Sequence, residues 1–158
     1  MDVTIRKAEP SDSAGLLRLL KQIAGLHHAG RPDIFRPAGS KYDEREIADI
    51  LRDEMKPVFV AVDDTQRVLG YAFCILRECK GDAMLQDRRT LYIDDLCVDA
   101  QQRGQGLGKA LMDAVRNHAA QTGAVSLELN VWNFNKPALA FYEHLGFGVQ
   151  KSILELPI

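Results

Sequence analysis

Three glycines at alternate positions form the most distinctive pattern in the sequence. Gly104, Gly106 and Gly108 lie in the stretch Arg103–Lys109, between a segment typical of a strand and one typical of a helix. Because glycine lacks a Cβ atom, a ligand can approach successive main-chain N–H groups of such a turn. The N-terminus of the following helix adds about half a positive charge. The turn is therefore suited to bind an anion such as a pyrophosphate.

Two common nucleotide-binding motifs fit this turn poorly. A Walker A loop needs a serine or threonine after its Gly-Lys pair, but Ala110 follows Lys109. A dinucleotide-binding turn has the spacing G-x-G-x-x-G in the first strand-to-helix turn, whereas these glycines alternate and come late in the chain. The pattern that remains is R-x-x-G-x-G, from Arg103 to Gly108, with Leu107 expected to anchor the helix in the core.

A second pattern is the pair Asp94-Asp95 inside an apolar, strand-like segment. Adjacent side chains of a strand point to opposite faces, so one carboxylate is expected on each side of the sheet. Consecutive aspartates are also poor strand formers, which indicates a bulge that opens the sheet here. A carboxylate can take the proton from an alkylammonium group, and an amine must lose that proton before it can attack a carbonyl.

The hydrophobic pattern predicts the elements that must position these groups. Strands are expected over residues 3–8, 58–62, 68–76, 90–98, 125–131 and 148–156. Helices are expected over residues 11–27, capped by Ser11 or Asp12, then 43–55 and 106–121, with a short helix from Pro137 to just before Gly146. Residues 80–89 are expected to form a loop in which Arg88 and Arg89 are solvated.

Strand 90–98, helix 106–121 and strand 125–131 form a βαβ unit, which implies two parallel neighbouring strands joined by a right-handed crossover. The strands over residues 58–62 and 68–76 fit an antiparallel hairpin. We therefore expect an α/β (α+β) fold with a mixed, mostly antiparallel sheet and helices on both faces. With 158 residues, and no repeat or linker, the chain is expected to form a single domain over residues 1–158.

Composition narrows the classes of function. The apolar share of 46% and charged share of 27% are typical of a soluble globular protein. A formal charge of -2 supplies no general attraction for nucleic acid. Cys74, Cys79 and Cys97 form no C-x-x-C pair, so neither a disulfide framework nor a metal site is expected, and a reducing cytoplasm is the simplest location. No apolar run approaches the length of a membrane span, and no signal peptide is expected.

Three segments, in order and at family-like spacing, resemble the GNAT superfamily of acetyl-CoA-dependent N-acetyltransferases. They are the strand Ile93–Val98, the Arg103–Gly108 turn, and Asn135–Tyr142 followed by Leu145-Gly146-Phe147. The likeness is strong over about residues 92–147 and weaker before them. It implies a GNAT-like fold and a co-substrate, acetyl-CoA, whose pyrophosphate lies on the amides of the turn and whose pantetheine arm lies between splayed strands near Leu96 and Val98.

The resemblance also assigns residues to the cofactor. Contacts with CoA are expected from Leu96, Cys97, Val98, Arg103, Gly104, Gln105, Gly106, Leu107, Gly108, Lys109, Asn135, Ala138 and Tyr142. Taken alone, Asn135 is also a good helix cap, and the two roles can coexist. We interpret Cys97 as a packing residue beside the cofactor and not as a nucleophile, because no histidine is placed to activate it.

Catalytic roles follow from the same resemblance. Tyr142 matches the general acid that protonates the departing CoA thiolate, a role in which a tyrosine hydroxyl carries no competing charge. The diamine acetyltransferase branch carries a Glu-Asp pair at the position of Asp94 and Asp95, which makes Asp94 the expected proton acceptor and Asp95 an amine-binding charge. A main-chain N–H, here that of Leu96, is expected to stabilise the oxyanion.

The sequence does not identify the molecule that accepts the acetyl group. A small primary amine, such as a polyamine or an amino acid, is the leading hypothesis, with a protein N-terminus or lysine as the alternative. Asn130 stands where N-terminal acetyltransferases often carry a catalytic glutamate, and Glu128 could substitute for it. A non-catalytic sensor of acetyl-CoA is a hypothesis of another class. His27, His28, Trp132 and Phe134 are candidates to border the acceptor site, and the oligomeric state is open, although many members are homodimers.

Overall fold

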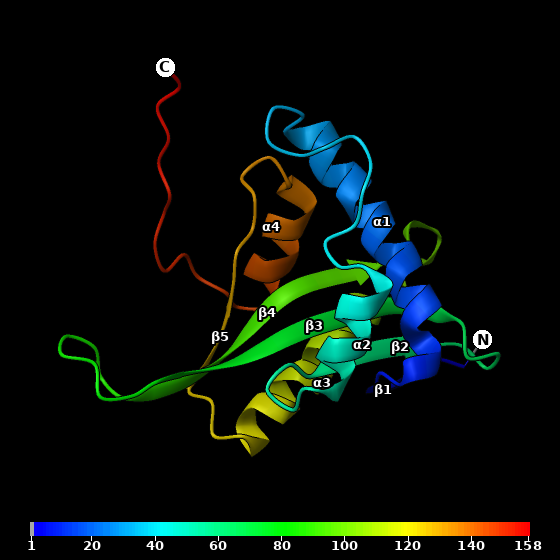
Figure 1. Ribbon diagram of the computed structural model, residues 1–158, viewed down its shortest axis with the longest axis horizontal. Helices are drawn as coiled ribbons and strands as arrows, with labels where there is room; N and C mark the ends of the chain where they lie inside the picture. Colours follow the sequence, from blue (N-terminus) through cyan, green and yellow to red (C-terminus); the bar gives the residue numbers. More distant parts are fainter. Residues whose placement is uncertain (1) are drawn as a thin grey trace.

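A five-stranded sheet runs through the computed structural model, which describes residues 2–158 (Figure 1). Its strands follow chain order: β1 (Thr4–Lys7), β2 (Val58–Val62), β3 (Val68–Cys79), β4 (Arg88–Val98) and β5 (Ser126–Leu129). Every neighbouring pair is antiparallel except β4 and β5, which are parallel. The predicted mixed, mostly antiparallel sheet and its βαβ unit are confirmed.

Four helices cover the two faces of this sheet, as predicted. They are α1 (Ser13–Gly30), α2 (Glu44–Arg52), α3 (Leu107–Gln121) and α4 (Lys136–His144), with single 3₁₀ turns at Pro10–Asp12 and Ala100–Gln102. Local sequence explains their ends. Asp43 accepts from the amide of Glu46 and Glu46 accepts from the amide of Asp43, a reciprocal cap that starts α2. Pro137 lies in the first turn of α4.

The chain has one hydrophobic core on each side of the sheet. On one side α1 and α2 pack against alternate residues of β2 and β3, with Leu16, Val60 and Tyr71 at its centre. On the other side α3 and α4 pack against the remaining residues, with Leu111 and Leu91 fully buried. Because strand side chains alternate, β2 contributes to both cores, and all five of its residues are buried. No helix within residues 2–158 has the length and apolar character needed to cross a bilayer.

Several predicted boundaries are wrong, and long-range contacts explain why. Helix α1 continues to Gly30, where the ring of Phe134 covers its last turn. Asp12 does not cap α1 with its side chain, because Arg6 binds that carboxylate at 2.7 Å. Helix α2 ends at Arg52, three residues before the expected position. Within β4, Arg88 and Arg89 are not solvated loop residues. They pair instead with acids on the neighbouring strands, Glu128 and Glu78 respectively.

The predicted closing strand over residues 148–156 is also wrong. Helix α4 ends as expected, with Gly146 at a φ of 94° and the amide of Phe147 bonded to the carbonyl of Tyr142. Residues 148–158, called the C-terminal tail below, then run away from β5 as an extended segment exposed along its whole length (Figure 1). Its β-forming residues find no neighbouring strand within residues 2–158, so no sheet ladder forms.

The core on the α1 side allows a direct test of packing. Leu16 is fully buried, and truncating a buried leucine to alanine costs about 2–5 kcal/mol because a cavity remains. We expect Leu16→Ala to lower the urea midpoint accordingly. The matched control is Leu85→Ala in the β3–β4 loop, where 54% of the residue is exposed and little change is expected. Equal effects of the two substitutions would contradict this core assignment.

Candidate active site

A β-bulge in β4 places the two aspartates. Asp95 pairs with Phe73 and Ile93 pairs with Cys74, so Asp94 is an extra residue without a partner on β3. The predicted bulge is confirmed. The expectation that the carboxylates face opposite sides is wrong, because the inserted residue breaks the alternation: Asp94 contacts Tyr42 and Asp95 contacts Tyr71, and both tyrosines pack on the α1 side.

Asp94 is held by the loop between α1 and α2. The ammonium of Lys41 lies 3.1 Å from the Asp94 carboxylate and 2.8 Å from its main-chain oxygen, and the hydroxyl of Tyr42 donates a very short hydrogen bond to the same carboxylate. Burial and the Asp94 charge both raise the pKa of Tyr42, so its hydroxyl stays protonated. These contacts hold residues 31–43 against β4.

Asp95 lies deeper, against the hydroxyl of Tyr71 at 3.2 Å. Burial raises the pKa of Asp95 to about 6, although the Lys41 ammonium and the Tyr71 hydrogen bond act in the opposite direction. Near neutral pH this carboxyl group therefore exchanges a proton readily, which is the property of a general base.

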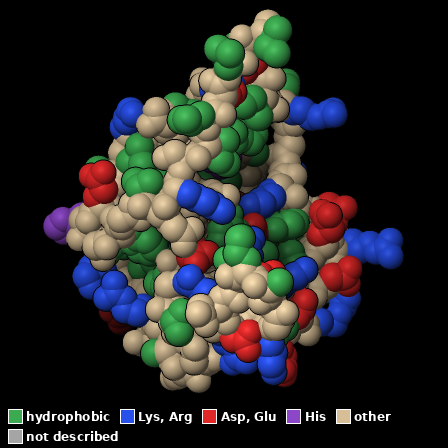
Figure 2. All heavy atoms as spheres, turned by 90° about the vertical axis from the view of Figure 1, so that its left-hand side faces the viewer, with side chains coloured by type: hydrophobic (Ala, Val, Ile, Leu, Met, Phe, Trp, Pro, Cys, Tyr) green, Lys and Arg blue, Asp and Glu red, His purple; other side chains and the backbone are tan. Residues whose placement is uncertain are grey.

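A cavity of about 580 Å³ opens where β4 and β5 separate. The two strands pair over four residues, ending at Ile93 and Leu129, while β4 continues to Val98. The splayed strands that the resemblance implies are thus present. Figure 2 views the face of the molecule that carries β5 and α4, and hydrophobic side chains gather over its upper half. The cavity is lined by Asp94, Asp95, Leu96, Asn135, Ala138 and Tyr142, among others.

Tyr142 projects into this cavity from α4. Its ring packs edge-on against Phe141 at 5.2 Å and Phe147 at 5.6 Å. Burial, together with the negative charge of Asp95, raises the pKa of Tyr142 above that of a free tyrosine. The hydroxyl is therefore protonated at neutral pH, and Tyr142 and Asp95 both line the cavity.

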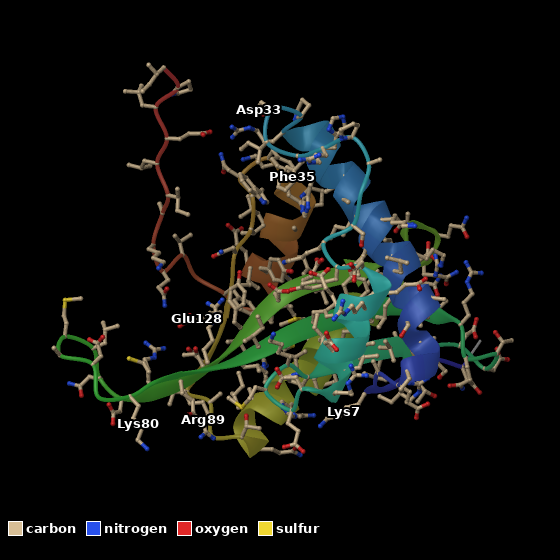
Figure 3. All side chains as sticks on the ribbon, viewed as in Figure 1. Lys7, Asp33, Phe35, Lys80, Arg89 and Glu128 are labelled. Carbon is tan, nitrogen blue, oxygen red and sulfur yellow. The ribbon has the colours of Figure 1, made fainter. Side chains whose placement is uncertain are left out.

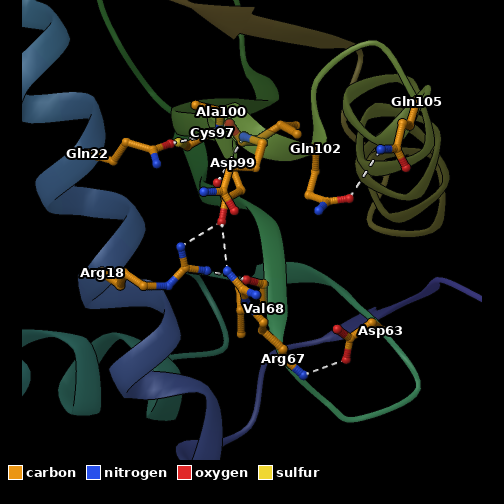
Figure 4. Close-up of polar contacts among 12 residues, drawn as sticks. Arg18, Gln22, Asp63, Arg67, Val68, Cys97, Asp99, Ala100, Gln102 and Gln105 are labelled. Atoms are coloured by element: carbon orange, nitrogen blue, oxygen red, sulfur yellow. Dashed lines mark hydrogen bonds and ion pairs between the residues drawn. The ribbon is translucent and has the colours of Figure 1, made fainter. Parts of the chain in front are cut away.

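Asp99 anchors the 3₁₀ turn that immediately precedes the glycine turn. This buried carboxylate accepts from the amide of Gln101 at 3.2 Å and binds the guanidinium of Arg18 at 2.6 Å, with Arg67 at 3.6 Å (Figure 4). The 3₁₀ turn that starts at Ala100 is therefore tied to both α1 and the β2–β3 hairpin. A turn held at three points can present its main chain in one conformation.

Gly106 and Gly108 are required to be glycine for different structural reasons. Gly106 caps α3 with a φ of 78°, a conformation that other residues rarely adopt. The first amides of α3, from Leu107 onward, have no acceptor within the helix. A Cβ atom on Gly108 would lie 3.2 Å from the ring of Phe141, so this glycine lets α4 approach α3. Leu107 is buried and anchors the helix as predicted.

The remaining predicted cofactor residues are spread around the cavity and the turn. Arg103 and Gln105 are exposed, and Lys109 is paired with Asp113 at 2.7 Å. Asn135 caps α4 by accepting from the amide of Ala138 at 3.3 Å, as expected from its position before Pro137. Of these residues, Asn135 and Ala138 line the cavity, whereas Arg103, Gln105 and Lys109 lie in the glycine turn outside it.

Cys97 and Val98 lie on opposite sides of β4, one in each core. Cys97 is buried in the α1-side core, and burial raises the pKa of its thiol to about 12, with the Asp95 charge acting in the same direction. A neutral, buried thiol supports its interpretation as a packing residue. Val98 packs with Phe141 around Gly108 on the α3 side.

An aromatic cluster borders the cavity beyond β5. Phe35 stacks on His27 at 5.0 Å and meets Trp132 edge-on at 5.2 Å, while Phe134 stacks with Trp132 at 6.1 Å. Figure 3 shows Phe35 at the end of α1 above α4. His28 turns instead to the carbonyl of Phe35. The sequence analysis missed Phe35, Lys41, Tyr42 and Tyr71, because no local motif marks residues that meet only across the fold.

Glu128, the expected substitute for a catalytic glutamate, points elsewhere. Its carboxylate lies 3.4 Å from Arg88 and accepts from Gln150 at 3.3 Å, and it does not line the cavity (Figure 3). Asn130 does line the cavity but cannot accept a proton. Within residues 2–158 no group of three or more His, Cys, Asp or Glu side chains is placed to hold a metal ion.

Comparison with known proteins gives this site its context. The family model described as the acetyltransferase (GNAT) family matches residues 23–147, which include the turn, both aspartates and α4. The chain belongs to the GNAT acetyltransferase family. A mutant of the BH1408 protein from Bacillus halodurans has a crystal structure that superposes on this GNAT chain with a TM-score of 0.94, at 33% identity, covering 98% of this chain and 99% of that one.

Relatives of this GNAT chain are named for different substrates. A thialysine N-epsilon-acetyltransferase from Sus scrofa is 34% identical over 91% of this chain and 83% of its own length. A mycothiol acetyltransferase from Kocuria rhizophila is 38% identical over 56% of this chain, but the chain spans only 28% of that protein. An aminoglycoside N-acetyltransferase in complex with CoA shares the fold, with a TM-score of 0.73 at 17% identity.

The raised pKa of Asp95 predicts that removing its negative charge stabilises the folded chain. Since the pKa of Asp95 is raised to about 6 in the folded chain, ionisation of Asp95 opposes folding by on the order of 3 kcal/mol once the pH exceeds about 6. This penalty is absent below the ordinary pKa of an aspartate, where the group is protonated in both states. We expect Asp95→Asn to raise the thermal midpoint at pH 8, with a gain that shrinks as the pH falls toward 4.

The neighbouring Asp94→Asn variant is the matched control. It weakens the ion pair with Lys41 and changes the acceptor of the Tyr42 hydroxyl, so it should lower the midpoint or leave it unchanged. Calorimetric scans of the three proteins between pH 4 and pH 8 measure both effects. A loss of stability in Asp95→Asn at pH 8 would show that its ionised form is not disfavoured by burial.

Proposed function

We propose that this chain is an acetyl-CoA-dependent N-acetyltransferase that moves the acetyl group directly onto a primary amine of a small molecule, such as a polyamine or an amino acid. The observation that carries the proposal is the shared cavity, which holds the buried carboxyl of Asp95 and the protonated hydroxyl of Tyr142 at the point where β4 and β5 separate. Acyl transfer to nitrogen needs one group to take a proton and another to give one.

The glycine turn supports acetyl-CoA as the co-substrate. We assign its pyrophosphate to the main-chain amides of Arg103–Lys109, where the start of α3 favours negative charge. We assign the pantetheine arm to the unpaired side of β4 at Leu96, Cys97 and Val98, with Asn135 and Ala138 of the α4 start opposite. An edge of main chain without a neighbouring strand has free hydrogen-bonding groups that an amide-containing arm can use.

The proton transfers that we propose use two side chains. Acetyl-CoA supplies the acetyl group as an activated thioester. Asp95 takes one proton from the acceptor ammonium, and the free amine then attacks the thioester carbonyl. As the carbon–sulfur bond breaks, Tyr142 gives its hydroxyl proton to the departing sulfur, and the second proton of the new amide nitrogen is released to solvent. The amide of Leu96 is the proposed donor to the oxyanion. Both side chains return to their resting states by exchange with solvent through the cavity.

The contacts of the two aspartates favour a division of roles opposite to the one expected from the resemblance. Asp94 is already engaged by the ammonium of Lys41 and the hydroxyl of Tyr42. Within residues 2–158 the one side-chain hydrogen-bond partner of Asp95 is the hydroxyl of Tyr71, and its pKa is raised to about 6. We therefore propose Asp95 as the proton acceptor and Asp94 as the charge that attracts the amine, a site now occupied by an alkylammonium of the chain itself.

A small amine is favoured over a protein acceptor by the aromatic cluster at residues 27, 35, 132 and 134, which encloses the far end of the cavity. The Sus scrofa relative is named for the N-epsilon group of thialysine, which is a small molecule. A protein lysine is the second candidate, because a peptidyl-lysine N-acetyltransferase of Salmonella typhimurium is 28% identical over 94% of this chain. The free thiols of Cys74 and Cys97 suit a reducing compartment such as the cytoplasm.

The assigned turn can be tested with two glycines of equal strain. Gly106 and Gly123 have φ values of 78° and 75°, and a Cβ atom at either would meet no neighbour within 4 Å. Alanine at either position is expected to cost about 1 kcal/mol of stability. Only Gly106→Ala should also weaken CoA binding, by about tenfold in calorimetric titration, because relief of its strain displaces the amides of α3. Equal CoA affinities in the two variants would remove the turn from the cofactor site.

The proposed catalytic roles predict distinct kinetic changes. Tyr142→Phe should lower kcat by about 100-fold without changing the affinity for CoA, because it removes only the hydroxyl proton. In the unchanged protein, kcat/KM for the amine should rise with pH through about 6 as Asp95 ionises. That rise should be absent from the residual activity of Asp95→Asn. Activity of Tyr142→Phe equal to that of the unchanged protein would refute its role as the acid.

The function itself is tested by thiol release from acetyl-CoA with a panel of amines, including polyamines, amino acids and lysine peptides. Release with a small amine at a higher kcat/KM than with any peptide is the expected result. Faster release with peptides would favour the second candidate. Tight CoA binding without thiol release for any amine would instead indicate a sensor of acetyl-CoA.

A further inference from the structure

The cavity contains a primary amine that belongs to the chain itself. Lys41 lies in the connection between α1 and α2, which descends from the upper end of α1 to the start of α2 in Figure 1. Its ammonium lies 2.8 Å from the main-chain oxygen of Asp94 and 3.1 Å from the Asp94 carboxylate. Lys41 lines the cavity together with Asp95 and Tyr142. One chain therefore supplies an amine next to the proposed proton acceptor and proton donor.

The position of this amine differs from that of an ordinary surface lysine. Its main-chain contact is with the bulged residue of β4, one position before the proposed proton acceptor Asp95. Burial raises the pKa of Asp95 to about 6, and the charge of Lys41 is the strongest influence that acts against burial. An interaction of that strength requires the two groups to be close. The Lys41 amine is therefore held beside the carboxyl that can take its proton.

The contact between Lys41 and Asp94 is one that the chain can break at small cost. The Lys41 side chain is 42% exposed, and an ion pair of this exposure stabilises a fold by about 0–1 kcal/mol. Asp94 keeps the hydroxyl of Tyr42 as a partner when Lys41 leaves. The lysine stem has four rotatable carbons, so its amine can move within the cavity while the backbone stays in place. An amine tethered in this way needs no binding step from solution.

We propose that Lys41 is an acetyl acceptor of its own chain, modified when acetyl-CoA is bound and no external amine occupies the site. The inference rests on the proposed function. Asp95 takes one proton from the Lys41 ammonium, and the free Nζ forms a bond with the acetyl carbon. Tyr142 gives its hydroxyl proton to the sulfur as the carbon–sulfur bond breaks, and the second proton of Nζ is released to solvent. The products are acetyl-lysine and free CoA thiol.

The product limits the reaction to one turnover for each chain. The amide nitrogen of acetyl-lysine carries no positive charge, so the modified Lys41 no longer forms an ion pair with Asp94. The carboxylate of Asp94 is then available to the ammonium of an external acceptor. An external amine that binds there first displaces Lys41 and protects it, because both amines use the same carboxylate.

The first experiment follows the protein and not its turnover. The full chain is incubated with acetyl-CoA without an added amine, and its mass and its peptides are measured over time. Lys56 is the matched control, because it also pairs with an aspartate and is 44% exposed, but it lies beside a second cavity lined by Pro57 and His118. We expect one acetyl group for each chain, gained at Lys41 about tenfold faster or more than at Lys56. Equal rates would overturn the proposal, since they indicate uncatalysed reaction.

The Tyr142→Phe variant separates catalysed transfer from chemical acetylation. It should slow the modification of Lys41 by about 100-fold and leave that of Lys56 unchanged. The same variant, grown with heavy nitrogen and mixed with the unchanged protein, shows whether transfer stays within one chain. We expect the heavy Lys41 peptide to remain unmodified at the rate of the isolated variant. Rapid acetylation of the heavy chain would overturn transfer within the same chain.

Thiol release with the panel of small amines, measured on the same sample, distinguishes this inference from the proposed function. Release with a small amine while Lys41 stays unmodified in the amine-free sample would overturn the inference and leave the function in place. Bound CoA without transfer to Lys41 or to any amine would overturn both. Modification of Lys41 that falls as the amine concentration rises is the result expected if both hold.

Discussion

The end of the pairing between β4 and β5 is the constraint on which the site depends. Strand β4 pairs with β3 from Arg88 to Val98 apart from the bulged Asp94, but with β5 only as far as Ile93. Beyond that residue β4 has no neighbouring strand on this side within residues 2–158, and main-chain polar groups away from water need a partner. The bulge falls at the next residue, Asp94, and turns two carboxylates to one side. The cavity and the two aspartates that line it therefore both arise where β4 passes from Ile93 to Asp94.

The ionised form of Asp95, which the proposed proton transfer requires, destabilises the folded chain. An aspartate with little solvent around it is unfavourable as an anion, and Asp95 has a raised pKa for this reason. The Tyr71 hydroxyl and the nearby Lys41 ammonium offset part of that cost. A stronger partner, such as a direct guanidinium contact, would stabilise the fold further but would leave a carboxylate too weakly basic to take a proton near neutral pH.

Sequence alone predicted the features that are set within a few residues. The Gly106 turn, the burial of Leu107, the Asn135 cap and the Gly146 termination each follow from local backbone requirements, and all were found. The bulge was predicted because two aspartates disfavour a regular strand, but the direction of their side chains was not. That direction depends on Tyr42 and Tyr71, which reach the aspartates from 52 and 24 residues away. No pattern in the sequence marks such contacts.

The tail shows a different limit. The alternating apolar residues of the tail are typical of a strand, and residues 148–158 are indeed extended, with Leu154 and Leu156 on one side. A strand, however, is defined by its neighbour, and local sequence states only that a segment can pair, not with what.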